Sequence, residues 1–365
     1  MSEESLADML DEEDDTDHGR GATEPVEGKV VTLRSIDAES TSLRPVSFSE
    51  IIGQDHIKDP LQRYISAANQ RGVTLDHVLL SGQAGLGKTA LAGATANALN
   101  APVIHLTGPQ LSITTIEEAL VSTIINKIQE SGRLVVFIDE IHGVDKMTMT
   151  VMLPLVEDFR FRDQVLPPFT LIGATTDPAK LLAPFRNRFQ ITFDLEFYTE
   201  EEIREIMLRY LRRKLDISAK AAEMMITDQE AFTGLSKRAR GVPRRAEHLI
   251  LRMLDFMLQP DNSYTPITAE IVKQTCTALR LDEYGLEYKD RLLLVAMLRR
   301  YHGRHVGVRS LAAAIGETVA NLEGLIEPDL VRMGFILREP RGRTLSPLGI
   351  RVATEALKSG ERFPI

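Results

Sequence analysis

Short runs of apolar residues recur in the first half of the chain, and most are followed by small or polar residues. This pattern is typical of strands that are buried on both faces of a sheet. Helical stretches separate the runs, at residues 56–70, 90–99 and 114–131. Strands that alternate with helices predict a parallel sheet covered by helices. The predicted strands are Val78–Leu80, Val103–Leu106, Leu134–Ile138 and Phe169–Thr176, and the alternating stretch Gln190–Phe193.

The second half has a different pattern, in which apolar residues recur every three or four positions. From residue 199 to about 277 the chain is expected to be helical, with Thr199 opening the first helix. Gly241-Val242-Pro243 interrupts a second helical stretch and places Arg244 at a helix start. Ser49 is a plausible cap for the helix near residue 56, and Thr114 or Thr115 for the helix that ends near Ser131.

Residues 278–358 are rich in arginine and predict three helices followed by a β-hairpin. The helices are placed near Lys289–Tyr301, Val308–Ile315 and Val319–Met333. Three helices and a hairpin suggest a winged helix, whose wing touches phosphate. A winged fold used only for protein contacts is the alternative. Arg341 and Arg343 lie at the hairpin turn, where they cannot serve the core, and this position favours DNA binding.

These patterns divide the chain into four parts. A chain of 365 residues is long enough for two or three domains. We expect an α/β protein with a first domain built on a parallel sheet, an all-helical second domain, called the lid below, and a C-terminal winged-helix domain. The predicted boundaries are an acidic tail at 1–40, the sheet domain at 41–198, the lid at 199–277 and the winged helix at 278–358.

Composition and charge set limits on the class of protein. The single cysteine, Cys276, excludes an internal disulfide and a cysteine-based metal cage. No stretch resembles a membrane span or a signal peptide, so we expect a cytoplasmic protein.

The charge of the chain is unevenly distributed. Residues 1–28 hold eleven acidic residues and one arginine, which gives this segment a charge of −10. Since the net charge of the whole chain is −9, the other residues together carry a charge of +1. The tail is expected to be disordered, either without a task or as an arm that binds a partner or mimics DNA.

The strand at Val78–Leu80 leads into Gly82–Thr89, which has the G-x-x-x-x-G-K-T pattern of a Walker A loop. An alanine-rich helical stretch follows, as this motif requires. The glycines let backbone N–H groups point at phosphate oxygens, and the N-terminus of the helix adds its positive end. A tight glycine turn in an ordinary α/β protein would not need all these features together. The predicted ATP contacts are Gly82, Gly85, Leu86, Gly87, Lys88, Thr89 and Ala90.

Two carboxylates, Asp139 and Glu140, follow the strand at Leu134–Ile138. Because open α/β sheets place their chemistry at the carboxyl ends of strands, both acids should lie beside the phosphate loop. We predict that Asp139 and the Thr89 hydroxyl hold Mg²⁺, and that Glu140 orients or activates the attacking water. A lone Asp-Glu pair usually marks only a turn, but its position behind this strand predicts a Walker B motif.

The motifs and their order resemble those of RuvB-type AAA+ ATPases, the motors of Holliday junction branch migration, and the resemblance implies a P-loop ATPase domain at 41–198 with a helical lid at 199–277. The pieces run in family order from near residue 43 to near residue 350. They are Leu43-Arg44-Pro45, Gly53-Gln54, Leu75–Leu80, the Walker A loop, Phe137–His142, Glu157-Asp158-Phe159, Leu171–Thr176, Arg240–Arg244, Ser310–Glu317, and Gly334-Phe335 with Pro340–Arg343.

The resemblance implies roles for residues that the patterns alone leave open. Thr176 resembles sensor 1 of the family, and Arg244, otherwise an unremarkable surface arginine, resembles sensor 2. Arg188 resembles the arginine finger that completes the site of a neighbouring subunit, which implies a homo-oligomeric ring, usually a hexamer. Ile52, Tyr198 and Pro243 fall where the family holds adenine, and Arg341 and Arg343 resemble wing residues on DNA phosphates.

The chain departs from the family in three places. The hairpin through which RuvB docks onto RuvA is reduced here to Arg160–Pro167, which removes much of the expected surface for a RuvA-like partner. Gln83-Ala84 replaces the two prolines common in the phosphate loop, and the acidic tail is longer than expected.

Two functions therefore stand against each other. The first is an ATP-dependent ring motor, a helicase or translocase that moves duplex DNA and drives branch migration of four-way junctions in recombination and repair. The second is a RuvB-derived assembly or adaptor ATPase that acts with a different partner. A DNA-binding regulator with an inert nucleotide fold is disfavoured, because Glu140 and Arg188 are both present.

Glu140→Gln tests the assignment of the catalytic carboxylate. The amide cannot accept a proton from water, so the variant should bind ATP with its affinity kept and fail to hydrolyse it. Nucleotide titration and steady-state phosphate release measure the two properties. Wild-type turnover in this variant would contradict the assignment.

Overall fold

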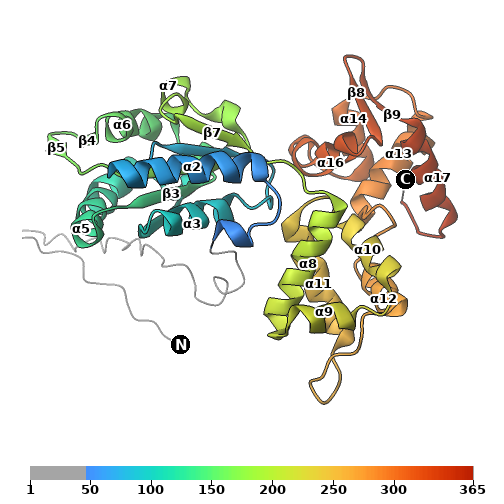
Figure 1. Cartoon of the computed structure of the whole chain (residues 1–365). Coiled ribbons are helices and arrows are strands. Elements are labelled where there is room, and N and C mark those ends of the chain that lie inside the picture. The colour runs from blue at the N-terminus through green and yellow to red at the C-terminus, as the bar shows by residue number, and fades with distance from the viewer. Residues whose placement is uncertain (1–46, 365) are drawn as a thin grey trace, which may run out of the picture. The chain divides into compact units, whose positions relative to one another are not determined.

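The computed structural model describes residues 47–364, and its N-terminal part is built on a five-stranded sheet (Figure 1). The strands are β1 (Val78–Ser81), β2 (Val103–Thr107), β3 (Val135–Asp139), β6 (Thr170–Thr175) and β7 (Ile191–Asp194). They pair in the order β2-β3-β6-β1-β7 and are all parallel, as predicted. The predicted acidic tail (1–40) and the motif at 43–45 lie outside the described residues.

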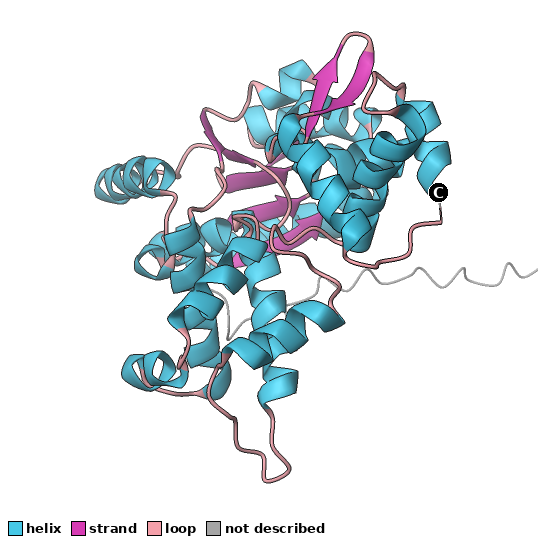
Figure 2. Cartoon of the chain, turned by 90° about the vertical axis from the view of Figure 1, so that its right-hand side faces the viewer, coloured by secondary structure: helices cyan, strands magenta, loops and turns pink. Residues whose placement is uncertain are grey.

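Alternate side chains of the strands pack into two different cores, because successive residues of a strand point to opposite faces. The helices of this part of the chain are α2 (Asp55–Arg71), α3 (Lys88–Ala98), α4 (Ile113–Thr115), α5 (Val121–Ser131), α6 (Lys146–Glu157) and α7 (Ala183–Arg186). Val78, Leu80 and Ile172 pack on one face with α2 and α3. Leu79 and Leu171 pack on the other face with α5, α6 and α7. Figure 2 shows the strands lying among helices.

Three local predictions were wrong. The strand at residues 103–107 is at the edge of the sheet, so Val103 is 37% exposed rather than buried. Ser49 caps no α-helix, since it lies inside a short 3₁₀ turn and α2 begins after Gln54 without a side-chain cap. Ser112, rather than Thr114 or Thr115, caps the next helical segment, because its hydroxyl accepts a hydrogen bond from the Thr115 N–H at 3.1 Å.

The helical segment after β7 begins as predicted. The Thr199 hydroxyl accepts from the Glu202 N–H at 3.2 Å, and the Glu202 carboxylate accepts from the Thr199 N–H at 2.8 Å, which forms a capping box. The break at Gly241-Val242 is also confirmed. The helices are α8 (Glu200–Leu215), α9 (Ala219–Met225), α10 (Gln229–Arg238), α11 (Pro243–Met257) and α12 (Ala269–Ala278).

The C-terminal part has the three predicted helical segments and the hairpin. These elements are α13 (Tyr288–Tyr301), α14 (Val308–Ile315), α15 (Val319–Asn321), α16 (Glu327–Arg332), β8 (Ile336–Glu339) and β9 (Gly342–Leu345). A π-helical turn, Leu322–Ile326, joins α15 to α16. The sequence interpretation missed the last helix, α17 (Pro347–Lys358), which packs on α13 and is capped by the Ser346 hydroxyl.

The hairpin at the position of the family's RuvA-docking element is very short. Its strands are β4 (Arg160–Phe161) and β5 (Gln164–Val165), so only Arg162 and Asp163 form the turn. Arg162 forms an ion pair with Glu117 of the helical segment before α5. The tip of the hairpin is therefore held against the sheet domain.

No helix within residues 47–364 is long and apolar enough to cross a membrane. The longest helix in this range, α2, has 17 residues, and several of them are charged. A span needs about 20 predominantly apolar residues.

Candidate functional site

The phosphate loop lies between β1 and α3, as predicted, with its glycines in conformations that other residues rarely adopt. Gly85 and Gly87 have φ of +86° and +102°. A Cβ on Gly85 would lie 2.9 Å from side-chain atoms of Val242 and Arg244, so the contact with the lid also needs glycine. Helix α3 begins at Lys88, so its first free N–H groups face the space inside the loop.

Lys88 is buried, and its ammonium group is held by the loop itself. Its Nζ donates to the carbonyl oxygens of Gly82 at 2.6 Å and Gln83 at 3.1 Å. Burial lowers the pKa of Lys88, while the nearby carboxylates of Glu140 and Asp139 raise it and Arg244 lowers it further. A cation in such a position is suited to an anionic ligand, because the phosphates would replace the carbonyl contacts with full negative charges.

The two carboxylates lie at the carboxyl end of β3, beside the loop. Asp139 is the last residue of the strand, and its Oδ1 accepts from the Glu140 N–H at 3.0 Å. Glu140 has a φ of +47°, a left-handed conformation that turns its side chain away from the strand direction. The Thr176 hydroxyl lies 3.4 Å from Glu140 Oε2, so the predicted sensor 1 and the predicted catalytic carboxylate are neighbours.

His142 also contacts this carboxylate and was missed in the sequence. Its Nδ1 lies 3.2 Å from Glu140 Oε2 and 3.0 Å from the Thr175 hydroxyl. The histidine therefore bridges Glu140, which follows β3, and Thr175 at the end of β6. The available signal in the sequence was that His142 follows the Asp139-Glu140 pair by only two residues, so its side chain can contact the same turn.

A pocket brings together most of the predicted nucleotide residues. Gly85, Gly87, Lys88, Thr89 and Ala90 line it from the loop and α3. Asp139 and Glu140 line it from the carboxyl end of β3 and the residue after it. Ile52, Tyr198, Pro243 and Arg244 line it from the segments around the lid. Gly82 and Leu86 are in the loop but do not line the pocket. Leu86 is buried, and its carbonyl oxygen accepts from the Tyr198 hydroxyl at 3.1 Å. Burial raises the pKa of Tyr198 to about 12, so this phenol stays a donor.

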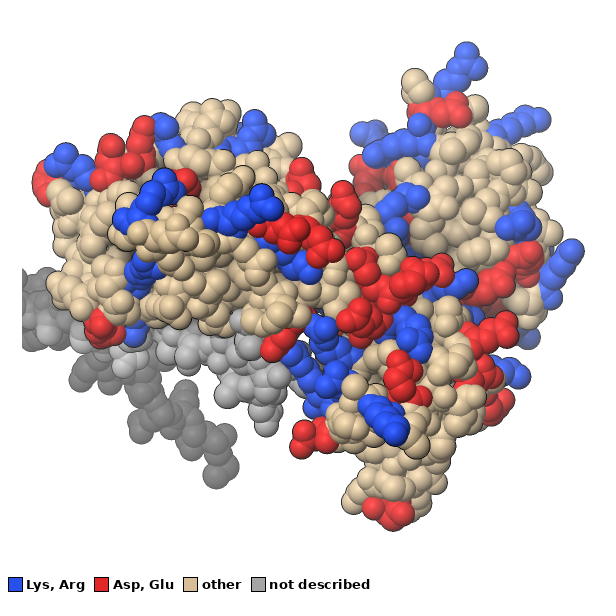
Figure 3. Space-filling model, viewed as in Figure 1, with Lys and Arg blue, Asp and Glu red and all other residues tan. Residues whose placement is uncertain are grey.

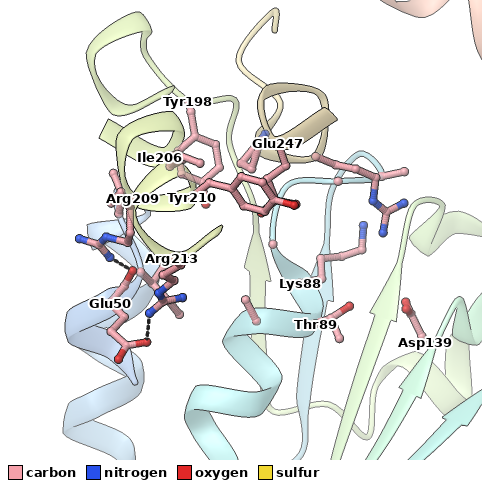
Figure 4. Close-up of a pocket in the computed structure, with 18 of the residues that line it drawn as sticks. Glu50, Lys88, Thr89, Asp139, Tyr198, Ile206, Arg209, Tyr210, Arg213 and Glu247 are labelled. Carbon is pink, nitrogen blue, oxygen red and sulfur yellow. Dashed lines mark hydrogen bonds and ion pairs between the residues drawn. The ribbon is translucent and has the colours of Figure 1, made fainter. Parts of the chain in front are cut away.

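The lid contributes further pocket residues that the sequence did not single out. Figure 4 shows Arg209 and Arg213 of α8 meeting Glu50, which precedes the predicted adenine residue Ile52. Arg213 pairs with the Glu50 carboxylate at 2.7 Å, and Arg209 donates to the Glu50 carbonyl oxygen. Tyr210 and Glu247 line the same space from α8 and α11. The one available signal was the run of arginines on α8, which is equally typical of a solvated helix face.

Arg188, the predicted arginine finger, lies outside this pocket. It follows α7, and its guanidinium pairs with Glu157 at the end of α6 at 2.6 Å. Its Nε has no hydrogen-bond partner within residues 47–364. Its role towards a neighbouring subunit stays a prediction.

The two predicted DNA-binding arginines have different surroundings. Arg341 is exposed in the turn of the β8–β9 hairpin. Arg343 lies on β9 and donates to the carboxylates of Glu327 (2.9 and 3.0 Å) and Glu323 (2.7 Å), and these hydrogen bonds raise its pKa. Figure 3 shows basic and acidic side chains intermixed around the hairpin. Of the two, only Arg341 presents its cation without such carboxylate partners among the described residues.

The parallel sheet, the glycine loop with a buried lysine and the carboxylates at the end of β3 define a P-loop ATPase of the AAA+ class. Its phosphate loop lies against a helical segment that carries an arginine, and a winged helix follows. Nucleotide binding follows from this class.

Comparison with known proteins agrees with this architecture. Residues 43–195 match the family model for the Holliday junction DNA helicase RuvB P-loop domain, and residues 283–354 match the RuvB C-terminal winged helix domain. The RuvB branch migration complex subunit of Fervidobacterium nodosum is 38% identical over 329 residues, which cover 86% of this chain and 89% of that protein. The Staphylococcus aureus (strain JH9) subunit is 36% identical, over 86% of this chain and 94% of that protein.

The solved Thermotoga maritima RuvB Holliday junction branch migration motor superposes with a TM-score of 0.71 at 35% identity, covering 89% of this chain and 99% of that one. The chain therefore belongs to the RuvB family and is an ATPase of the helicase type. The resemblance found in the sequence is confirmed.

Tyr198→Phe tests the contact between the phosphate loop and the residue that directly precedes the lid. The variant loses one hydrogen bond to Leu86, so nucleotide affinity should fall by about 2- to 10-fold, in line with a net hydrogen-bond contribution of about 0.5–1.5 kcal/mol. Titration with a fluorescent nucleotide measures it. Tyr264→Phe, which changes a 38% exposed tyrosine, is the matched control and should bind as the wild type does. Equal affinities for all three proteins would contradict the role of Tyr198.

Proposed function

We propose that this chain is an ATP-driven motor that moves duplex DNA and drives branch migration of four-way junctions. The observation that carries the proposal is the pocket, in which the phosphate loop, both carboxylates of β3 and Arg244 converge. The relatives named above are branch migration proteins over nearly their whole length, which supports the motor over an assembly or adaptor ATPase.

The residues of the pocket fit a nucleoside triphosphate with Mg²⁺. Thr89 and Asp139 each supply one hard oxygen ligand. Within residues 47–364 no group of three or more His, Cys, Asp or Glu side chains could hold a metal ion by itself. Two protein oxygens suit Mg²⁺, which keeps waters and binds phosphate oxygens as further ligands. When bound, the ion would neutralise charge on the phosphates.

The positions of these residues support the following hydrolytic roles. Glu140, held by His142 and Thr176, accepts a proton from the attacking water or orients it. Lys88 and Arg244 stabilise negative charge that develops on the phosphates. By the family resemblance, Arg188 serves the pocket of the next subunit, and its position outside the pocket of its own chain is consistent with that role. This division of labour implies a ring, for which a hexamer is the expectation.

The winged helix is the proposed contact with DNA, through Arg341 at the tip of the wing. A RuvA-like partner also belongs to this proposal, although the β4–β5 hairpin offers it little surface. Movement of the lid against the sheet domain, set by the contacts of Tyr198 and Arg244 with the loop, would transmit hydrolysis to the DNA.

A labelled four-way junction tests the motor function. With ATP and Mg²⁺ the protein should convert the junction into duplex products, and turnover should rise in the presence of DNA. Binding should weaken steeply as salt rises, because it depends on phosphate contacts. An adaptor would assemble with nucleotide and leave the junction intact, which would contradict the proposal.

Mixing two inactive variants tests the shared site. Arg188→Ala should lower turnover by about 10³-fold or more, because arginine fingers contribute that much in comparable enzymes. A mixture of Arg188→Ala and Glu140→Gln subunits should regain activity, since some interfaces then pair an intact Glu140 with an intact Arg188. Each variant alone is the control. A mixture as inactive as its components would contradict a finger that acts between subunits.

A further inference from the structure

A buried cluster of charges joins the lid to the winged helix. At its centre is Asp329 of α16, whose side chain is only 2% exposed. Arg245 contacts its carboxylate at 2.6 Å, Arg240 at 3.2 Å and Arg332 at 3.3 Å. Arg240 and Arg245 belong to the segment that opens α11, and Asp329 and Arg332 belong to the winged helix.

Arg240 is the most buried cation of the cluster. Its side chain is 2% exposed, and it also reaches Asp290 of α13 at 2.5 Å and the Gly285 carbonyl oxygen at 3.0 Å. Burial works to raise the pKa of Asp329, but the charges of Arg245 and Arg240 outweigh it, so the pKa lies below its ordinary value. Charges in such a place depend on one another, because a buried ion without its partner is strongly unfavourable.

On the lid side, the cluster continues directly into the nucleotide pocket. Arg245 follows Arg244, which lines the pocket, and the Arg240 carbonyl oxygen accepts from Arg332 at 3.0 Å. The Arg332 guanidinium also lies 3.8 Å from the ring centre of Phe197. Phe197 precedes Tyr198, the residue that contacts the phosphate loop. Two short paths therefore join the pocket to the cluster. One runs from Arg244 through Arg245 to Asp329, and the other runs from Tyr198 through Phe197 to Arg332.

On the winged-helix side, α16 carries a second buried carboxylate that faces the wing. Glu327 lies two residues before Asp329, is 4% exposed, and binds Arg343 of β9 and Arg338 of β8. Helix α16 ends the helical stretch that precedes the wing, the position from which helix-turn-helix proteins reach a groove. One turn of α16 is therefore fixed to the lid by Asp329 and to the wing by Glu327.

We propose that Asp329 is a positioning residue that couples the nucleotide pocket to DNA bound at the winged helix. The inference rests on the proposed motor function and names the residue through which its two sites communicate. A change in the position of α11 on nucleotide binding moves Arg245 and Arg240, and the shared carboxylate moves α16 with them. By linkage, DNA that shifts α16 changes nucleotide affinity in return.

Asp329→Asn in the full chain tests the coupling. The amide keeps the shape of the side chain and removes the charge that holds the three arginines. We expect turnover without DNA and duplex affinity without nucleotide to stay within about twofold of the wild type, whereas stimulation of turnover by duplex DNA falls at least about fivefold. The change in duplex affinity caused by a non-hydrolysable ATP analogue should be lost to the same extent. A residue that served only folding would lower both basal properties and leave the two ratios unchanged.

Two further variants complete the experiment. Glu317→Gln removes an ion pair with Lys289 that lies wholly within the winged helix, and both ratios should stay at their wild-type values. Arg332→Gln changes a partner of Asp329 that is 30% exposed, and it leaves Asp329 paired with Arg240 and Arg245. Both ratios should fall in this variant as well. It is the deciding variant if Asp329→Asn does not fold.

Wild-type stimulation in a folded Asp329→Asn, or in Arg332→Gln where Asp329→Asn does not fold, would overturn this inference alone. A wild-type protein whose turnover ignores DNA would overturn the proposed motor function as well.

Discussion

The close contact between the phosphate loop and the lid depends on Gly85. It has no Cβ, and so the loop can lie against Val242 and Arg244. A second glycine, Gly241, lies against Tyr198, where a Cβ would be 2.7 Å from the Tyr198 carbonyl oxygen. Since both glycines also have positive φ, neither position accepts a side chain without strain. The pocket exists because the phosphate loop, Tyr198 and the start of α11 approach one another closely.

That approach determines the electrostatics of the site. Lys88 and Arg244 face Asp139 and Glu140 across a small space, so cations and carboxylates are close to the same point. A ligand with both phosphate and metal charges can satisfy both signs at once, whereas a simple anion would meet the carboxylates. A ligand that binds here enters between the lid and the sheet domain, because residues of both line the pocket.

Much of this arrangement was predictable from the sequence, because the elements that carry it have strong local signals. The apolar runs predicted the strands, the glycine pattern predicted the loop, and Thr199 with Glu202 predicted the start of α8. The capping predictions at Thr114 and Thr115 were wrong because several hydroxyl residues lie close together and only the backbone decides which one caps. The prediction at Ser49 was wrong because α2 begins after Gln54 without a side-chain cap. Helix α17 was missed although Ser346-Pro347 is a helix-start signal. Arg209, Arg213 and Glu50 could not be predicted, since they are far apart in the chain and meet only when α8 covers the pocket.

The short β4–β5 hairpin limits the area of any protein interface at this position. Two residues of extended chain reach only about 7 Å, and the tip is held by Glu117 through Arg162. Such a stub offers a small footprint, well below the total of about 1,200 Å² that stable protein pairs bury. A protein that binds here must therefore form most of its contacts with the helices next to the hairpin, and its residence time will depend mainly on those contacts.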